Sequence, residues 1–130
     1  MADIYDPTNF EKVCVNTVLE AVRESGPLRS PRAFYLCQSK TAQLTTSFRY
    51  HLTVIFFEHR EELLSHLQST ARNMASDQEE EELIWSLIQT FVHSLVTPIT
   101  IRRLIEDSRA TTEWLAEEVD ILSRTFLSGP

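Results

Sequence analysis

The stretch that decides the fold is residues 82–105, ELIWSLIQTFVHSLVTPITIRRLI. Its first half repeats apolar residues at three- and four-residue intervals, as one buried face of a helix does: Leu83, Ile84, Leu87, Ile88, Phe91 and Leu95. Thr97 and Pro98 then supply a hydroxyl cap and a proline at the first helical position, where the missing N–H is not needed. The stretch predicts one helix over 77–95 and a second over 98–127. The second is either one bent helix or two helices that meet near 110–112.

Upstream, helix signals of the same kind predict a first helix over 9–25. Thr8 and Glu11 have the spacing of a capping box, and Gly26 followed by Pro27 ends the pattern. Ser76 and Glu79 have the same capping-box spacing before the acidic run 79–82, whose charge suits the first turn of a helix.

Between these helices, apolar spacing predicts helices over 32–57 and 58–69. The segment 27–34, PLRSPRAF, carries two prolines and is interpreted as a connector, with the new element beginning beyond Pro31. Residues 53–57, TVIFF, also suit a strand. No partner strand is evident, and an isolated strand would leave its backbone polar groups unpaired, which favours helix.

Composition supports a single all-α domain over residues 1–130. The chain is 42% hydrophobic and 24% charged, with only 2 Gly and 5 Pro, which is too apolar for disorder and too poor in turn residues for a many-stranded β protein. A chain of 130 residues can enclose one core without disulfides or metal. We therefore expect a helical bundle.

Charge and cysteine content exclude several classes of protein. A net charge of -7 argues against binding nucleic acid, which requires clustered Lys and Arg. Cys14 and Cys37 form no disulfide framework and are expected to be reduced. The sequence also has no signal peptide and no apolar run long enough to span a membrane directly.

Catalytic and metal-binding patterns are weak, so we expect no enzyme, no metal and no cofactor. Glu58, Glu62 and His66 share one helix face, but a charged surface explains them better than a metal site does, because no matching second helix is found. Neither cysteine has a histidine nearby in sequence to act as a base, and both are expected to be core residues.

Two features suit recognition of another protein. Arg102 and Arg103 each precede an acid by four residues, which predicts surface ion pairs or, alternatively, an arginine that binds a partner carboxylate. The aromatic residues around Phe56 and Phe57 are more numerous than one buried stripe can hide. Some of them are expected to line a groove for an amphipathic helix.

The order of these elements resembles the Bcl-two family of apoptosis regulators, in particular the compact members carried by large DNA viruses, including fish iridoviruses. The sequence NFEKVCVNTVLEAVRESG resembles the family's first helix, and EHREELLSHLQ resembles the segment joining its second, groove-forming helix to the loop beyond. The stretch 82–105 resembles the fourth helix, the corner and the central fifth helix. At the corner, where the family reads Asn-Trp-Gly-Arg, this chain reads Thr97-Pro98-Ile99-Thr100.

The resemblance implies an inhibitor of apoptosis that sequesters amphipathic helices of pro-apoptotic proteins, Bim-like ones first, with Bak and Bax as further candidates. Arg102 or Arg103 would replace the family's groove arginine. The implied setting is the host cytoplasm, with the mitochondrial surface reached through partners. The implied groove is lined by Phe48, Leu52, Phe56, Leu64, Leu67, Phe91, Leu95, Ile99 and Arg102.

Two further expectations accompany this interpretation. The chain stops near the end of the family's sixth helix, which predicts uncovered apolar surface and a homodimer that buries it. The alternative function is a helical adaptor that inhibits host signalling through an outer surface.

Overall fold

The computed structural model describes residues 6–26, 29–107, 109, 111, 113–114, 116–118 and 120, and these residues form an all-helical fold without strands. The helices are α1 (Pro7–Ser25), α2 (Arg29–Ala42), α3 (Thr46–Glu58), α4 (Arg60–Met74), α5 (Gln78–Leu95) and α6 (Pro98–Glu106). The prediction of an all-α fold is confirmed, and residues 53–57 are helical.

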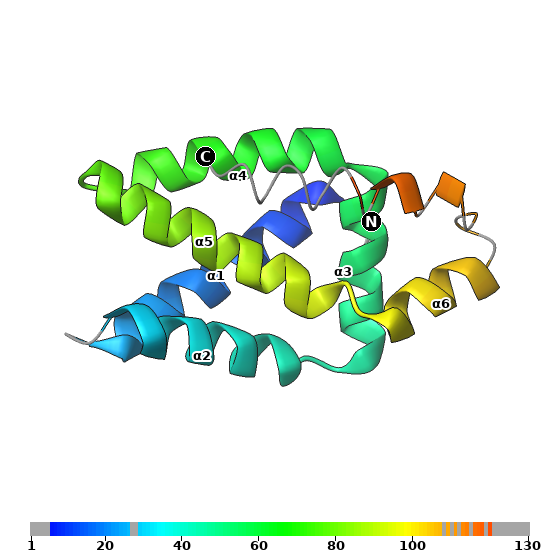
Figure 1. The fold of residues 1–130 in the computed structure, drawn as a ribbon, viewed down its shortest axis with the longest axis horizontal. Coiled ribbons are helices and arrows are strands. Elements are labelled where there is room, and N and C mark those ends of the chain that lie inside the picture. Colours follow the sequence, from blue (N-terminus) through cyan, green and yellow to red (C-terminus); the bar gives the residue numbers. More distant parts are fainter. Residues whose placement is uncertain are drawn as a thin grey trace.

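The helices pack around α5, which lies against α1, α2, α3 and α4. In Figure 1, α4 and α5 form the upper hairpin, α1 crosses α5 diagonally to reach α2 at the bottom, and α3 crosses the right-hand end. α6 continues outward from the end of α5 and packs mainly on α3. α1 likewise lies against α2, α3, α4 and α5, so the bundle is built around α1 and α5, whereas the resemblance put the central helix in the segment after Pro98.

Three aromatic rings from three helices join in the core. The Phe10 ring of α1 stacks on Phe56 of α3 at a centroid distance of 5.4 Å and meets the edge of Phe91 of α5 at 5.7 Å. All three side chains are fully buried. Aromatic pairs at such distances stabilise beyond their burial alone, so this cluster fixes how α1, α3 and α5 meet.

The predicted single helix over 32–57 is wrong, because α2 and α3 are separate helices. α2 ends at Ala42, and Thr45 caps α3 by accepting a hydrogen bond from the N–H of Phe48. The predicted start beyond Pro31 is also wrong. α2 begins at Arg29, and Pro31 occupies the first turn, where its missing N–H costs no helical hydrogen bond.

Two predicted helix caps are displaced and one is confirmed. Asp6 caps α1 and Asp77 caps α5, each with a carboxylate, in place of the predicted capping boxes at Thr8 and Ser76. Thr97 caps α6 as predicted, directly before Pro98 in the first turn, and it forms a capping box with Thr100. Gly26, with a φ of 64°, ends α1 in the left-handed region that glycine adopts without strain.

For the segment 98–127, the structure agrees with the second of the two predicted alternatives, two helices in place of one bent helix. α6 ends at Glu106, with Asp107 at its C-cap, and the described residues 113–114, 116–118 and 120 are helical again. A single helix through this region is therefore excluded. Residues 110 and 112, where the break was predicted, and residues 121–127 lie outside the described residues.

Candidate functional site

An apolar hollow of about 430 Å³ opens between the first turns of α1 and the side of α3 that runs from its cap, Thr45, to Ile55. Its volume lies in the range of pockets that hold small ligands or the anchoring side chains of a partner. It is lined by Asn9, Lys12, Val13, Thr45, Ser47, Phe48, His51, Leu52 and Ile55.

The floor of the hollow is apolar because α3 repeats large side chains at helical spacing. Phe48, Leu52 and Ile55 lie on one face of α3, and Val13 of α1 faces them across the hollow. Leu52 and Ile55 are buried, whereas Phe48 is 40% exposed. Phe48 therefore lies at the mouth, where a ligand can cover it.

The rim of the hollow carries a positive charge. Lys12 is exposed, and no carboxylate of the described residues pairs with it. Other described cations do pair: Lys40 contacts Glu20 and Glu24, and Arg72 contacts Glu81. The first turn of α3 also lines the hollow, through Ser47.

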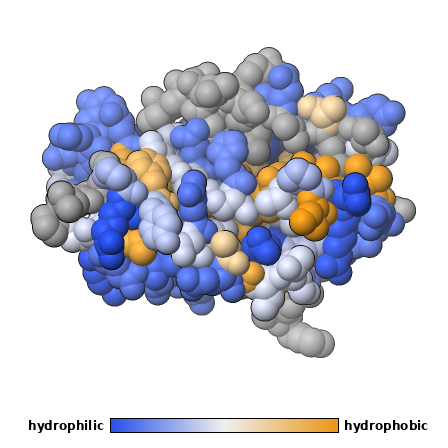
Figure 2. Space-filling model, turned by 60° about the horizontal axis from the view of Figure 1, so that its bottom comes forward, coloured by the Kyte–Doolittle hydropathy of each residue, from blue (hydrophilic) through white to orange (hydrophobic). Residues whose placement is uncertain are grey.

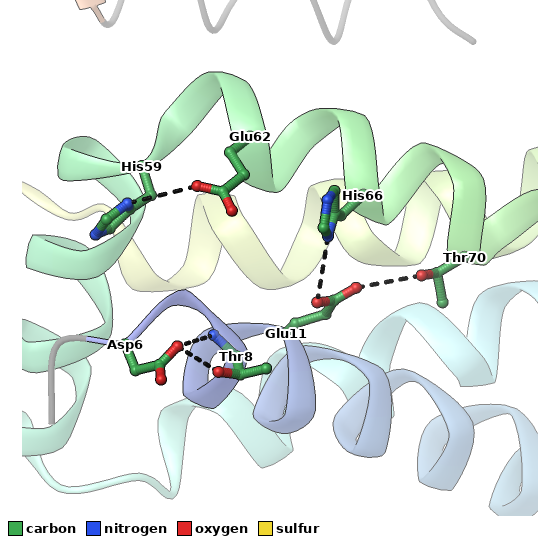
Figure 3. Close-up of polar contacts among 7 residues, drawn as sticks. All are labelled: Asp6, Thr8, Glu11, His59, Glu62, His66 and Thr70. Atoms are coloured by element: carbon green, nitrogen blue, oxygen red, sulfur yellow. Dashed lines mark hydrogen bonds and ion pairs between the residues drawn. The ribbon is translucent and has the colours of Figure 1, made fainter. Parts of the chain in front are cut away.

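Contacts from α4 hold the α1 wall of this hollow in place. Glu11 accepts a hydrogen bond from Thr70, with 3.3 Å between the oxygens, and lies 3.8 Å from His66 Nδ1, as Figure 3 shows. At the start of α1, Asp6 accepts hydrogen bonds from the backbone N–H and the hydroxyl of Thr8. These contacts position Lys12 and Val13, which follow directly.

Most of the predicted groove residues are core residues in this structure. Of the nine, only Phe48 and Leu52 line the hollow. Five others are at most 7% exposed and belong to the central hydrophobic cluster: Phe56, Leu64, Leu67, Phe91 and Leu95. They match a groove in spacing, but the packing of α1 and α5 covers them. Their contact with a partner helix stays a prediction.

The last two predicted groove residues lie on α6, outside the hollow. Ile99 is 71% exposed and Arg102 is exposed. Figure 2 shows hydrophobic residues gathered at the right-hand end of the molecule, where α3 and α6 lie. An ion pair was predicted for each of the two arginines, and the one between Arg103 and Asp107 is present, with 3.8 Å between Nε and Oδ2. The guanidinium of Arg103 also lies 4.3 Å from the centre of the Tyr50 ring.

Side chains with catalytic potential do not converge in the described part of the chain. Glu58 pairs with Arg109, Glu62 with His59, and His66 with Glu11, and none of the described residues form a cluster able to hold a metal ion. Both cysteines are buried, and burial raises the pKa of the Cys37 thiol to about 11 and that of Cys14 well above its usual value. Neither thiol is available as a nucleophile.

Sequence reasoning missed the α1 side of the hollow. Asn9, Lys12 and Val13 were assigned to an ordinary amphipathic helix, and no spacing rule shows which edge of such a helix borders an opening. The available signal was Lys12 itself, one of only two lysines in a chain with net charge -7.

Comparison with known proteins gives no match, either to a protein family model, to a curated protein or to a solved structure. Among the described helices, none alone has the length and apolar character to cross a bilayer. Only α5 and α6 taken together, across a 55° bend, meet those criteria.

Proposed function

We propose that the protein binds amphipathic helices of pro-apoptotic proteins in the hollow between α1 and α3 and thereby inhibits apoptosis as a Bcl-two-type protein. The observation that supports this most directly is the hollow at Phe48, whose ring is 40% exposed above the buried Leu52 and Ile55. A partner helix inserts an apolar side chain there and covers the Phe48 ring. The mechanism is occupancy, because sequestered helices cannot engage their targets.

The proposed site is smaller than the groove implied by the sequence resemblance. The core positions Phe56, Phe91 and Leu95 are unavailable to a ligand without repacking of the bundle. A short hollow offers room for few anchors, so affinity depends on how well each anchor is buried. We propose Bim-like helices as the first partners and Bak and Bax as further ones, met in the host cytoplasm or at the mitochondrial surface.

Binding of a labelled Bim-type helix peptide to the purified protein tests this proposal. We expect saturable binding at or below tens of micromolar, and Phe48→Glu should weaken it by about tenfold or more, since burying a phenylalanine contributes about 1.5–3 kcal/mol. Tyr35→Glu is the matched control, because Tyr35 is 66% exposed on α2 and does not line the hollow.

Absence of peptide binding at tens of micromolar would contradict the proposal and favour a helical adaptor that acts through an outer surface. The proposed homodimer is tested separately, because exposed apolar residues such as Ile99 would be buried by it. Sedimentation showing only monomer at tens of micromolar would contradict the dimer and leave the helix-binding proposal unaffected.

A further inference from the structure

We infer that the hollow between α1 and α3 also binds a medium-chain carboxylate, with its alkyl chain on the apolar surface of Val13 and Phe48 and its carboxylate at Lys12. This inference does not depend on the proposed helix binding. Because both ligands would use the same hollow, the carboxylate would compete with the partner helix for binding.

The shape and lining of the hollow suit an alkyl chain. A volume of about 430 Å³ is within the range of small-molecule pockets, which are mostly apolar with a few polar groups that orient the ligand. The accessible apolar surface comes from two helices, from the half-buried Val13 of α1 and the 40% exposed Phe48 of α3, which lie over the buried Leu52 and Ile55. Burial of an alkyl chain gains about 0.8 kcal/mol for each methylene group removed from water.

The charges around the hollow select an anionic head group. Lys12 is the one lining residue with a permanent positive charge, and none of the lining residues carries a carboxylate. The hydroxyl of Thr45 accepts a hydrogen bond from the N–H of Phe48. The N–H groups of Thr46 and Ser47, which come earlier in α3, have no acceptor within the helix. Lys12 and the N–H groups at the start of α3, which also lines the hollow, both favour an anion.

The same features favour a carboxylate over a phosphate. A phosphate group carries more charge and is usually held by several cations or a run of backbone donors, whereas this rim offers one lysine beside an apolar floor. The net charge of -7 on the chain repels anions elsewhere, so binding should be confined to this hollow.

The test is titration of the full chain with decanoate, decanol and decyltrimethylammonium below their micelle concentrations, followed by calorimetry and amide NMR shifts. We expect decanoate to bind most tightly, with shifts centred on Val13 and Ile55, and the cationic amphiphile to bind most weakly. Equal binding of all three amphiphiles, or decanoate shifts outside the α1 and α3 walls, would overturn the inference.

Two variants separate charge from folding. Lys12→Met keeps the aliphatic stem and should weaken decanoate binding about two- to fivefold, with decanol unaffected, as expected for a partly solvated ion pair. Ser47→Asp should stabilise α3, since it adds an acid to the first turn, yet weaken decanoate binding. Arg32→Met, an equal charge change on α2, is the control and should change nothing. Unchanged decanoate affinity in both hollow variants would refute the assigned head-group site.

Competition distinguishes this inference from the proposed function. Decanoate should displace a bound helix peptide in proportion to its own affinity. A chain that binds peptide but no decanoate would refute the inference alone. A chain that binds decanoate but no peptide would leave the inference intact and refute the proposed function.

Discussion

The phenol of Tyr50 donates a hydrogen bond to the carboxylate of Asp107, with 2.7 Å between the two oxygens, and so joins the middle of α3 to the end of α6. Arg103 lies over the same ring and also approaches Asp107. Tyr50 packs with Val54, Phe57 and Leu104 in a second apolar cluster beside the main core. This contact determines where α6 lies on the bundle.

Replacing Tyr50 with phenylalanine should lower the free energy of unfolding by about 1 kcal/mol, because the ring stays packed while the hydrogen bond is lost. Urea denaturation followed by the fluorescence of the buried Trp85 measures this. Tyr35→Phe, at an exposed position, should have no effect. A loss equal in both variants would contradict the assigned role of the hydrogen bond.

The same tyrosine should make the protein sensitive to high pH. Burial, followed by the hydrogen bond to Asp107, raises the pKa of Tyr50 to about 12 from a usual 10.0. The unfolded chain releases this proton first, so stability falls as pH rises from about 10 through about 12. Unfolding measured across that range in the native chain and in Tyr50→Phe should diverge, and parallel curves would contradict the shift.

Substitutions at two predicted groove positions should separate core from surface. Phe91→Ala removes a fully buried ring from the aromatic cluster and should cost about 3–5 kcal/mol. Ile99→Ala, at a side chain that is 71% exposed, should change stability by about 0.5 kcal/mol or less. Urea titrations give both values. A much smaller loss of stability in Phe91→Ala would contradict the burial of this ring in the aromatic cluster.

The capping box at α6 should be measurable on its own. Thr97→Ala removes the side chain that accepts from the N–H of Thr100 and should cost about 1 kcal/mol. Thr97→Ser keeps the hydroxyl and should restore most of that loss. Thermal unfolding of the two variants checks the order, and equal destabilisation would point to the lost methyl group instead.

Both thiols should be protected in the folded protein. Cys14 and Cys37 are fully buried, and their raised pKa values keep them protonated. A thiol reagent should therefore react slowly in buffer and rapidly in urea. Tyr35→Cys supplies an exposed control thiol, which should react at once. Fast labelling of the native cysteines would contradict the packing of α1 against α2.

Which segments are helical could be predicted well from the sequence, because apolar periodicity and caps are local signals. The α6 cap needed only Thr97 and Pro98, and α5 needed only its stripe of apolar residues. The break between α2 and α3 was missed because no Gly or Pro marks it. Asp6 and Asp77 were passed over as caps because a neighbouring hydroxyl offered the same spacing.

The site was harder to predict than the fold, because spacing alone does not distinguish a groove from a core. Phe48 and Phe56 have the same periodicity on α3, yet Phe48 is 40% exposed and Phe56 is fully buried. The difference comes from Phe10 of α1, which covers Phe56. That contact joins distant parts of the chain, and no local pattern encodes it.

The Phe10–Phe56–Phe91 cluster also sets the order in which the chain can complete its fold during synthesis. The ribosome releases Phe10 early, but the second ring that packs on it, Phe91, emerges only when most of the chain has been made. Until then the part of α1 that packs on α5 remains exposed and open to chaperones. The long loop closed by this contact should slow final docking relative to a bundle held by neighbouring helices alone.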